Sequence, residues 1–290
     1  MISRSVWIAF AALCLASGTY WILPTSELLP ALERQGLLFG VAALAALCFR
    51  PRRRIRPAAH LRLAIAGIGF FGLPTVALEI ARSGVGETTR SALFAMVPVV
   101  IIVAIITSDA AAGARRLLIP ALVGLGGLLL LLPLQSSFSL RGEWMLSLIS
   151  ATIVVTGICS VWLYRLLQGL ALPIAILTVG AANAIFLLLC AAACGDFVWS
   201  AGAFNAVASF SSVVDVLEIV VIIWLLREMP PIRFAARYLL IPLVTIVESF
   251  VLVRPAITLR IVSGTVLLAA GAGMLLILSD SDTGDFLSLR

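Results

Sequence analysis

The sequence predicts an all-α integral membrane protein, with ten transmembrane helices arranged as two inverted five-helix repeats. Three observations favour this fold: the composition, a succession of long apolar tracts and a weak internal repeat. Of the 290 residues, 62% are hydrophobic and only 12% are charged, and the mean hydropathy is +1.17. A soluble domain has about a quarter of its residues charged, so this composition excludes an ordinary globular protein.

The basic residues do not indicate a nucleic-acid-binding protein. All 20 of them are arginines, and the formal net charge is +6. The apolar excess leaves no solvated basic face that could meet a phosphate backbone. At roughly 20 residues for each helical span, the apolar tracts leave only short connectors and no soluble domain of useful size.

Ten apolar segments predict ten helices across the bilayer, because a chain with unpaired backbone groups cannot cross hydrocarbon. Barrel strands would instead alternate in hydrophobicity with a period of two. The first segment is similar to a signal peptide, but a matching segment later in the chain favours an uncleaved helix. The predicted helices are 6–24, 33–49, 61–82, 89–107, 117–134, 144–167, 172–194, 207–226, 233–252 and 260–279.

The loop between the second and third helices sets the predicted orientation. It carries the one dense basic run of the chain, over residues 50–56. Basic loops stay on the cytoplasmic side of a membrane. With ten spans, both termini are then cytoplasmic, and we expect an integral protein of the plasma (inner) membrane.

An internal repeat is visible when the chain is slid on itself by 144 residues. This offset pairs Pro98 with Pro242 and Gly127 with Gly271. Because five spans is an odd number, the second copy must enter the membrane from the opposite side, an arrangement characteristic of secondary transporters. The predicted organisation is a first repeat over 1–134, a connector over 135–143, a second repeat over 144–279 and a short acidic, solvated tail over 280–290.

Two stretches resemble the EamA-type repeat of the drug/metabolite transporter superfamily. Ala81 to Pro98, followed by an apolar run and a Gly-rich fifth helix, is similar to the first copy. Leu225 to Pro242, followed by Gly264 and Gly271, is similar to the second. The resemblance implies a ten-helix transporter whose central cavity is lined chiefly by helices 1, 3, 4, 6, 8 and 9.

Smaller motifs carry the same resemblance. The run 18–21 (Gly-Thr-Tyr-Trp) resembles a small-residue patch in the family's first helix, and Arg34 resembles an arginine that opens its second. Trp162 and Tyr164 resemble aromatic residues of its sixth helix. The chain departs from the family at 110–111 and 254–255, where helices four and nine usually end in Gly-Glu.

Carboxyl groups inside apolar spans are costly, so each is a candidate functional group. Asp215 and Glu218 lie three residues apart on the eighth helix, and we expect them on one face near the middle of the bilayer. Glu248 and Glu79 lie towards the outer ends of helices nine and three. Burial and like charge both favour the protonated form, so these groups are expected to exchange protons near neutral pH.

A structural interpretation of the same carboxylates stays open. Glu218 could form an ion pair with Arg237, and Glu79 could do so with Arg82 or Arg90. Such pairs would hold helices together and leave no carboxylate free for a solute or a proton.

Pro98 and Pro242 fall inside the predicted helices four and nine. Each lacks an N–H, so the carbonyls of Phe94 and Tyr238 lose their usual helical partner and the helix can kink. Their equivalent positions in the two halves favour a gating hinge, although packing alone also tolerates proline in membrane helices.

Aromatic and amide side chains are the remaining candidates. Tyr20, Trp21, Trp162 and Tyr164 place rings with polar edges on helices one and six, where they would suit a cationic or aromatic solute. The alternative for Trp21 and Tyr164 is the interfacial aromatic belt. Asn183 on helix seven is either a solute contact or an amide that joins helices.

The function that these patterns favour is secondary active transport of small organic solutes such as amino acids, amines or drugs, in the direction of export. The sequence has no nucleotide-binding P-loop, so ATP is not expected to drive transport, and protons are the expected coupling ion for alternating access. With one histidine and no metal-ligand spacing among five cysteines, we expect no metal, no cofactor and no catalytic residue. Two alternatives stay open: a non-transporting membrane scaffold or accessory subunit, and a membrane-embedded lipid-modifying enzyme.

Overall fold

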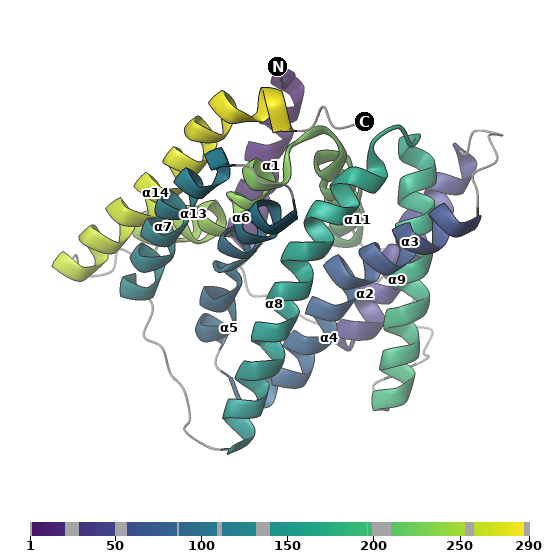
Figure 1. The fold of residues 1–290 in the computed structure, drawn as a ribbon. Helices are drawn as coiled ribbons and strands as arrows, with labels where there is room; N and C mark the ends of the chain where they lie inside the picture. Colours follow the sequence, from purple (N-terminus) through teal and green to yellow (C-terminus); the bar gives the residue numbers. More distant parts are fainter. Residues whose placement is uncertain are drawn as a thin grey trace.

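The structure, a computed structural model, is built from helices (Figure 1), which confirms the all-α prediction. Among the residues that the structure describes, six helical stretches are long and apolar enough to cross a membrane, so the chain has the make-up of a membrane protein; the count of ten spans stays a prediction. These stretches are Ala31–Cys48, Pro57–Ser83, Gly142–Leu167, Leu172–Cys194, Pro231–Leu252 and Leu259–Ser279. The residues that the structure describes are 2–20, 29–49, 57–85, 87–108, 112–131, 140–195, 197–198, 210–252 and 258–286.

Helix lies within each of the first five predicted segments. The first two are α1 (Arg4–Tyr20) and α2 (Ala31–Cys48). The third consists of α3 (Pro57–Gly67), the π-helical turn η1 (Ile68–Gly72), α4 (Leu73–Ile80) and the short 3-10 turn η2 (Ala81–Ser83). The fourth and fifth are α5 (Glu87–Phe94), α6 (Val97–Ser108), the 3-10 helix η3 (Ala112–Leu117) and α7 (Leu118–Leu131).

The last five predicted segments are also helical. They correspond to α8 (Leu140–Leu167), α9 (Leu172–Cys194), α11 (Phe210–Glu228), α12 (Pro231–Ala235) with α13 (Arg237–Leu252), and α14 (Leu259–Phe286). Two of the boundaries cross a predicted border between parts of the chain: α8 begins inside the expected connector, and α14 continues into the expected tail. The end of the first predicted helix, over 21–24, lies outside the described residues.

Two segments predicted as single helices are interrupted, and proline chemistry explains the first break. Segment 89–107 is broken at Ala95 and Met96, and α5 ends at Phe94, the residue whose carbonyl loses its partner to Pro98. In segment 233–252 the break is at Ala236, ahead of Pro242, which lies inside α13. The third segment stays helical but widens locally, in the π-helical turn η1 directly before α4.

Two long antiparallel seams organise the packing. Helix α2 packs along α9, and α7 packs along α14, the two helices drawn side by side in dark blue and yellow in Figure 1. Around these seams, α1 contacts α13 and α11, while α8 contacts α6, α3 and α4. The α7–α14 seam is close enough that a Cβ built on Gly127 would lie 2.5 Å from the backbone nitrogen of Leu268. A Cβ on Gly271 would lie 2.4 Å from the Cα of Gly124.

The role of the glycines in this seam can be tested by comparison with nearby glycines that face open space. We expect Gly127→Ala and Gly271→Ala to destabilise the protein by about 1–3 kcal/mol, because the methyl group would meet backbone and force the helices apart. Gly126→Ala and Gly273→Ala are the matched controls, since nothing lies within 4 Å of a Cβ at either position. Thermal unfolding in detergent measures the difference, and equal midpoints for all four variants would contradict the assignment.

Candidate functional site

The end of α1 lies against α13 and α11, and a glycine lets it come close. A Cβ on Gly18 would lie 2.6 Å from Cγ1 of Val244 on α13, so a larger residue would push the two helices apart. The Thr245 hydroxyl on α13 donates to the carbonyl of Gly18 at 3.3 Å. The residues on either side of Gly18 are therefore held against both neighbouring helices.

Those two residues donate hydrogen bonds to two of the predicted carboxylates. Ser17 Oγ donates to Oε1 of Glu218 on α11 at 2.7 Å, and Thr19 Oγ1 donates to Oε1 of Glu248 on α13 at 2.8 Å. Oε2 of Glu248 is buried and has no partner among the described residues. A buried acceptor without a donor is costly, so this oxygen is suited to accept a hydrogen bond from a ligand.

The third predicted carboxylate, Asp215, is paired with an arginine. Arg34 Nη2 on α2 lies 2.6 Å from Oδ2 of Asp215 on α11, and each side chain is 19% exposed. Asp215 and Glu218 thus lie on the side of α11 that meets α1 and α2, as their spacing predicted. The ion pair joins α2 to α11. Glu218 and Glu248 instead accept hydrogen bonds from hydroxyl groups of α1.

The alternative pairing of Glu218 with Arg237 is not what the structure has. The Arg237 guanidinium lies over the rings of Phe234 and Tyr238, at 4.3 and 4.7 Å from their centroids. Its Nη2 donates to the Tyr238 hydroxyl at 3.0 Å. Among the described residues no carboxylate forms an ion pair with it.

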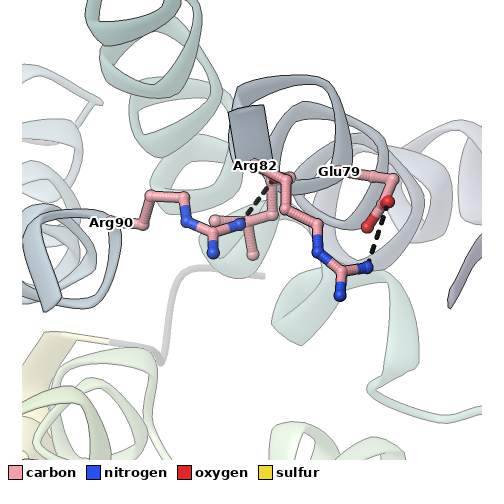
Figure 2. Close-up of polar contacts among 4 residues, drawn as sticks. Glu79, Arg82 and Arg90 are labelled. Carbon is pink, nitrogen blue, oxygen red and sulfur yellow. Dashed lines mark hydrogen bonds and ion pairs between the residues drawn. The ribbon is translucent and has the colours of Figure 1, made fainter. Parts of the chain in front are cut away.

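Glu79 lies apart from these groups, and here the structural interpretation agrees with the geometry. Figure 2 shows Arg82 Nη1 3.4 Å from Oε1 of Glu79, an ion pair between residues three apart in sequence. Arg90 comes from α5 and donates instead to the carbonyl of Leu78, at 2.9 Å. The Arg82 side chain is 56% exposed, so this cluster faces outward and holds the ends of α4 and α5 together.

Two of the aromatic candidates lie on a helix that carries none of these three carboxylates. Trp162 and Tyr164 lie on α8, the first exposed and the second half-buried. Tyr20 is the last residue of α1, but its side chain lies outside the described part of the structure, as does all of Trp21. Asn183 on α9 is fully buried: its Nδ2 donates to the carbonyl of Val179, and its Oδ1 has no partner in the described chain.

The two predicted hinge prolines occupy unequal positions. Pro98 is the second residue of α6, directly after the break at 95–96, whereas Pro242 lies six residues into α13. Pro242 lies three residues ahead of Thr245, whose hydroxyl donates to the carbonyl of Gly18, while the carbonyl that it frees, that of Tyr238, lies about two turns ahead of Thr245.

Sequence reasoning missed several polar groups of this region. Ser17 and Thr19 were hidden by their small size inside an apolar helix, although they flank a glycine. Glu33 is 1% exposed on α2, next to Arg34, and its Oε2 accepts from the backbone N–H of Val198 at 2.9 Å. Arg237 was weighed only as a partner for Glu218, while the available signal was Phe234 three residues before it and Tyr238 directly after it.

Comparison with known proteins shows a shared fold. No protein-family profile and no curated protein matches the chain. A solved structure described only as a crystal structure of a protein superimposes with a TM-score of 0.71 at 18% identity. The match covers 96% of this chain and 100% of that chain, so the two proteins have the same fold over nearly their whole lengths.

The Arg34–Asp215 pair is testable by a double-mutant cycle. We expect Arg34→Gln and Asp215→Asn to be coupled by about 0.5–3 kcal/mol, because the two half-buried side chains are in direct contact. Glu79→Gln with Arg82→Gln is the matched control, and its coupling should not exceed about 0.5 kcal/mol at the exposed surface. Unfolding in detergent measures both cycles, and additive effects of Arg34→Gln and Asp215→Asn would show that the pair does not hold α2 to α11.

Proposed function

We propose that this protein is a secondary active transporter of small organic solutes, coupled to protons and working by alternating access. The observation that carries the proposal is the pair of carboxylates, Glu218 and Glu248, held by hydroxyls of α1 in an apolar helix bundle. Each carboxylate has one oxygen bound to α1, and Oε2 of Glu248 has no partner among the described residues. A proton and a solute cation would compete for such oxygens, which is the requirement for exchange coupling.

The packing supports the inverted repeat. An offset of 144 residues relates α1 to α8, α2 to α9, α3 and α4 to α11, α6 to α13, and α7 to α14. Exchanging the halves turns the α1–α13 contact into α8–α6, the α1–α11 contact into α8–α4, and the α2–α11 contact into α9–α3. All of these helix pairs are in contact. The two seams, α2–α9 and α7–α14, each join a helix to its own counterpart, as a two-fold axis between the halves would require.

Individual contacts follow the same offset. Gly127 lies against the carbonyl of Gly264, and the equivalent contact is that of Gly271 with the carbonyl of Pro120. Gly40 lies against Ala184, its own counterpart. The repeat deduced from two prolines and two glycines therefore agrees with the atomic packing of both seams.

The direction of the seams supports opposite insertion of the two copies. Along α2 the glycine contacts rise from Gly36 to Gly40, while their partners on α9 fall from Leu188 to Ala184. Equivalent helices thus run antiparallel. If both cross a bilayer, the two repeats enter it from opposite sides, the arrangement that secondary transporters use for alternating access.

The three candidate carboxylates have no ionisable counterparts at the equivalent positions of the other half. At the offset of 144, Glu218 and Glu248 correspond to Pro74 and Ala104, and Asp215 corresponds to Phe71. Two halves that are similar in backbone but differ in charge would line one side of a central pathway with carboxylates and the other side with uncharged residues. This difference favours a single coupled site between α1, α11 and α13 over two equal sites.

Replacing one carboxylate separates transport from structure. We expect Glu218→Gln to reduce proton-coupled flux to background, because glutamine keeps the acceptor for Ser17 but cannot carry charge or exchange a proton. Glu228→Gln at the end of α11 is the matched control and should keep normal flux, since Glu228 pairs with its neighbour Arg227. The measurement is dissipation of an imposed pH gradient in liposomes as amines, amino acids and drugs are added.

Two outcomes contradict this proposal. Unchanged flux in Glu218→Gln would remove that residue from the mechanism. A wild-type protein that dissipates the gradient with none of the solutes would contradict proton-coupled transport itself.

Two native cysteines test the orientation of the repeats. Cys48 ends α2 and Cys194 ends α9; both are free and exposed. In variants that retain only one of them, a membrane-impermeant maleimide should label Cys48 only from the cytoplasmic side and Cys194 only from the opposite side. Labelling of both from the same side of sealed vesicles would contradict the inverted repeat, and labelling in detergent controls for reactivity.

A further inference from the structure

Arg237 is a buried cation in an aromatic environment. It is the first residue of α13 and is 9% exposed. Its guanidinium lies 4.3 Å from the ring centroid of Phe234, 4.7 Å from that of Tyr238 and 5.5 Å from that of Phe70. Aromatic rings stabilise a cation that lies over their faces, but they offset only part of the cost of removing a full charge from water.

The hydrogen-bonding capacity of this guanidinium is only partly used. One nitrogen donates to the Tyr238 hydroxyl, while Nε is buried and has no acceptor among the described residues. Within that same part of the chain no carboxylate forms an ion pair with Arg237. Buried charges are normally paired, so the environment has a cation and an unused donor but lacks an anion.

Two irregular backbone features bring these groups together. Phe70 lies within the π-helical turn η1, and Phe234 and Arg237 lie on the two sides of the break between α12 and α13. A π-helical turn rotates the residues that follow it and is frequent at functional sites. The N-terminal end of α13 also carries partial positive charge, which adds to the attraction for an anion.

Arg237 borders the same helix interface as the carboxylate site. Cys14 on α1 is within range of the charge of Arg237, and Ser17 lies one turn further along α1. On α13 the residues at 237, 241, 245 and 248 follow one another at helical spacing on one face. The α1–α13 interface therefore has a permanent cation at one end and two carboxylates towards the other.

We propose that Arg237 binds the carboxylate group of the transported solute, an inference that rests on the proposed transport function. The guanidinium fork matches a carboxylate with two parallel N–H···O bonds, and Nε supplies a donor that no described group uses. The rings of Phe70, Phe234 and Tyr238 exclude water and favour a solute with an apolar body. Glu218 and Glu248 then remain for the proton or for a cationic group of the same solute.

The test measures binding and needs no transport. Thermal unfolding of the purified protein in detergent is followed with sodium acetate, sodium benzoate and, at the same ionic strength, sodium chloride. We expect both carboxylates to raise the midpoint of the wild-type protein in a saturable way, because a ligand that binds only the folded state stabilises it. Loss of a charge-assisted hydrogen bond should weaken the apparent affinity of Arg237→Gln by roughly tenfold or more.

Two further variants complete the design. Arg237→Lys keeps the charge but lacks the fork, so its carboxylate affinity should lie between those of the wild type and Arg237→Gln. It also carries the test alone if Arg237→Gln does not fold. Arg227→Gln is the matched control, because Arg227 pairs with Glu228 at the end of α11, and it should respond as the wild type does.

Each contrary outcome is distinct. Carboxylate binding that is equal in the wild type and both Arg237 variants, or absent from the wild type, would overturn the inference. A response to chloride as large as that to acetate would assign the site to inorganic anions and overturn the solute carboxylate. If no flux is found but carboxylate binding still depends on Arg237, the transport proposal fails and the binding site stands. If flux depends on Glu218 but carboxylate binding does not depend on Arg237, the transport proposal stands and the assignment of Arg237 fails.

Discussion

The high cost of charge inside an apolar helix bundle is the constraint on which the structure depends. Each buried ionic group must find a hydrogen-bond partner, an opposite charge or an aromatic face. Asp215 meets Arg34, Glu218 meets Ser17, and Arg237 lies among three rings. Several buried polar atoms have no partner among the described residues, and two of them, Oε2 of Glu248 and Nε of Arg237, belong to charged groups of α13.

Close helix packing makes these contacts possible. Hydroxyl side chains are short, so Ser17 and Thr19 reach carboxylates only because Gly18 lets α1 approach α13. The same close approach occurs in both seams: Gly127 and Gly271 bring backbone against backbone between α7 and α14, and Gly180 does so against the carbonyl of Phe39 between α9 and α2. Small residues thus do two things here: they join the halves along α2–α9 and α7–α14, and they place donors beside acids on α11 and α13.

Interrupted helices are the second feature of the packing. The breaks at 95–96 and 236 and the π-helical turn at 68–72 occur in the segments that correspond between the halves or face each other across the bundle. A broken helix can change its angle without losing all its hydrogen bonds, so these are the points at which an exchange between two conformations would bend. Arg237 and Phe70 lie directly at two of them, which links solute binding to the bending elements in the proposed mechanism.

The sequence by itself determined the all-helical class and the approximate positions of the helices that the structure describes, because apolar tracts act locally and a chain in lipid must satisfy its backbone internally. It also located Asp215 and Glu218 on one face, since a spacing of three is a property of a single helix. Only the tertiary structure decided the partners, because they are distant in the chain: 181 residues separate Arg34 from Asp215, 201 separate Ser17 from Glu218, and 229 separate Thr19 from Glu248. No local sequence pattern specifies partners that are so far apart in the chain. For the same reason only the folded chain shows that Arg237 lies among aromatic rings and not beside Glu218.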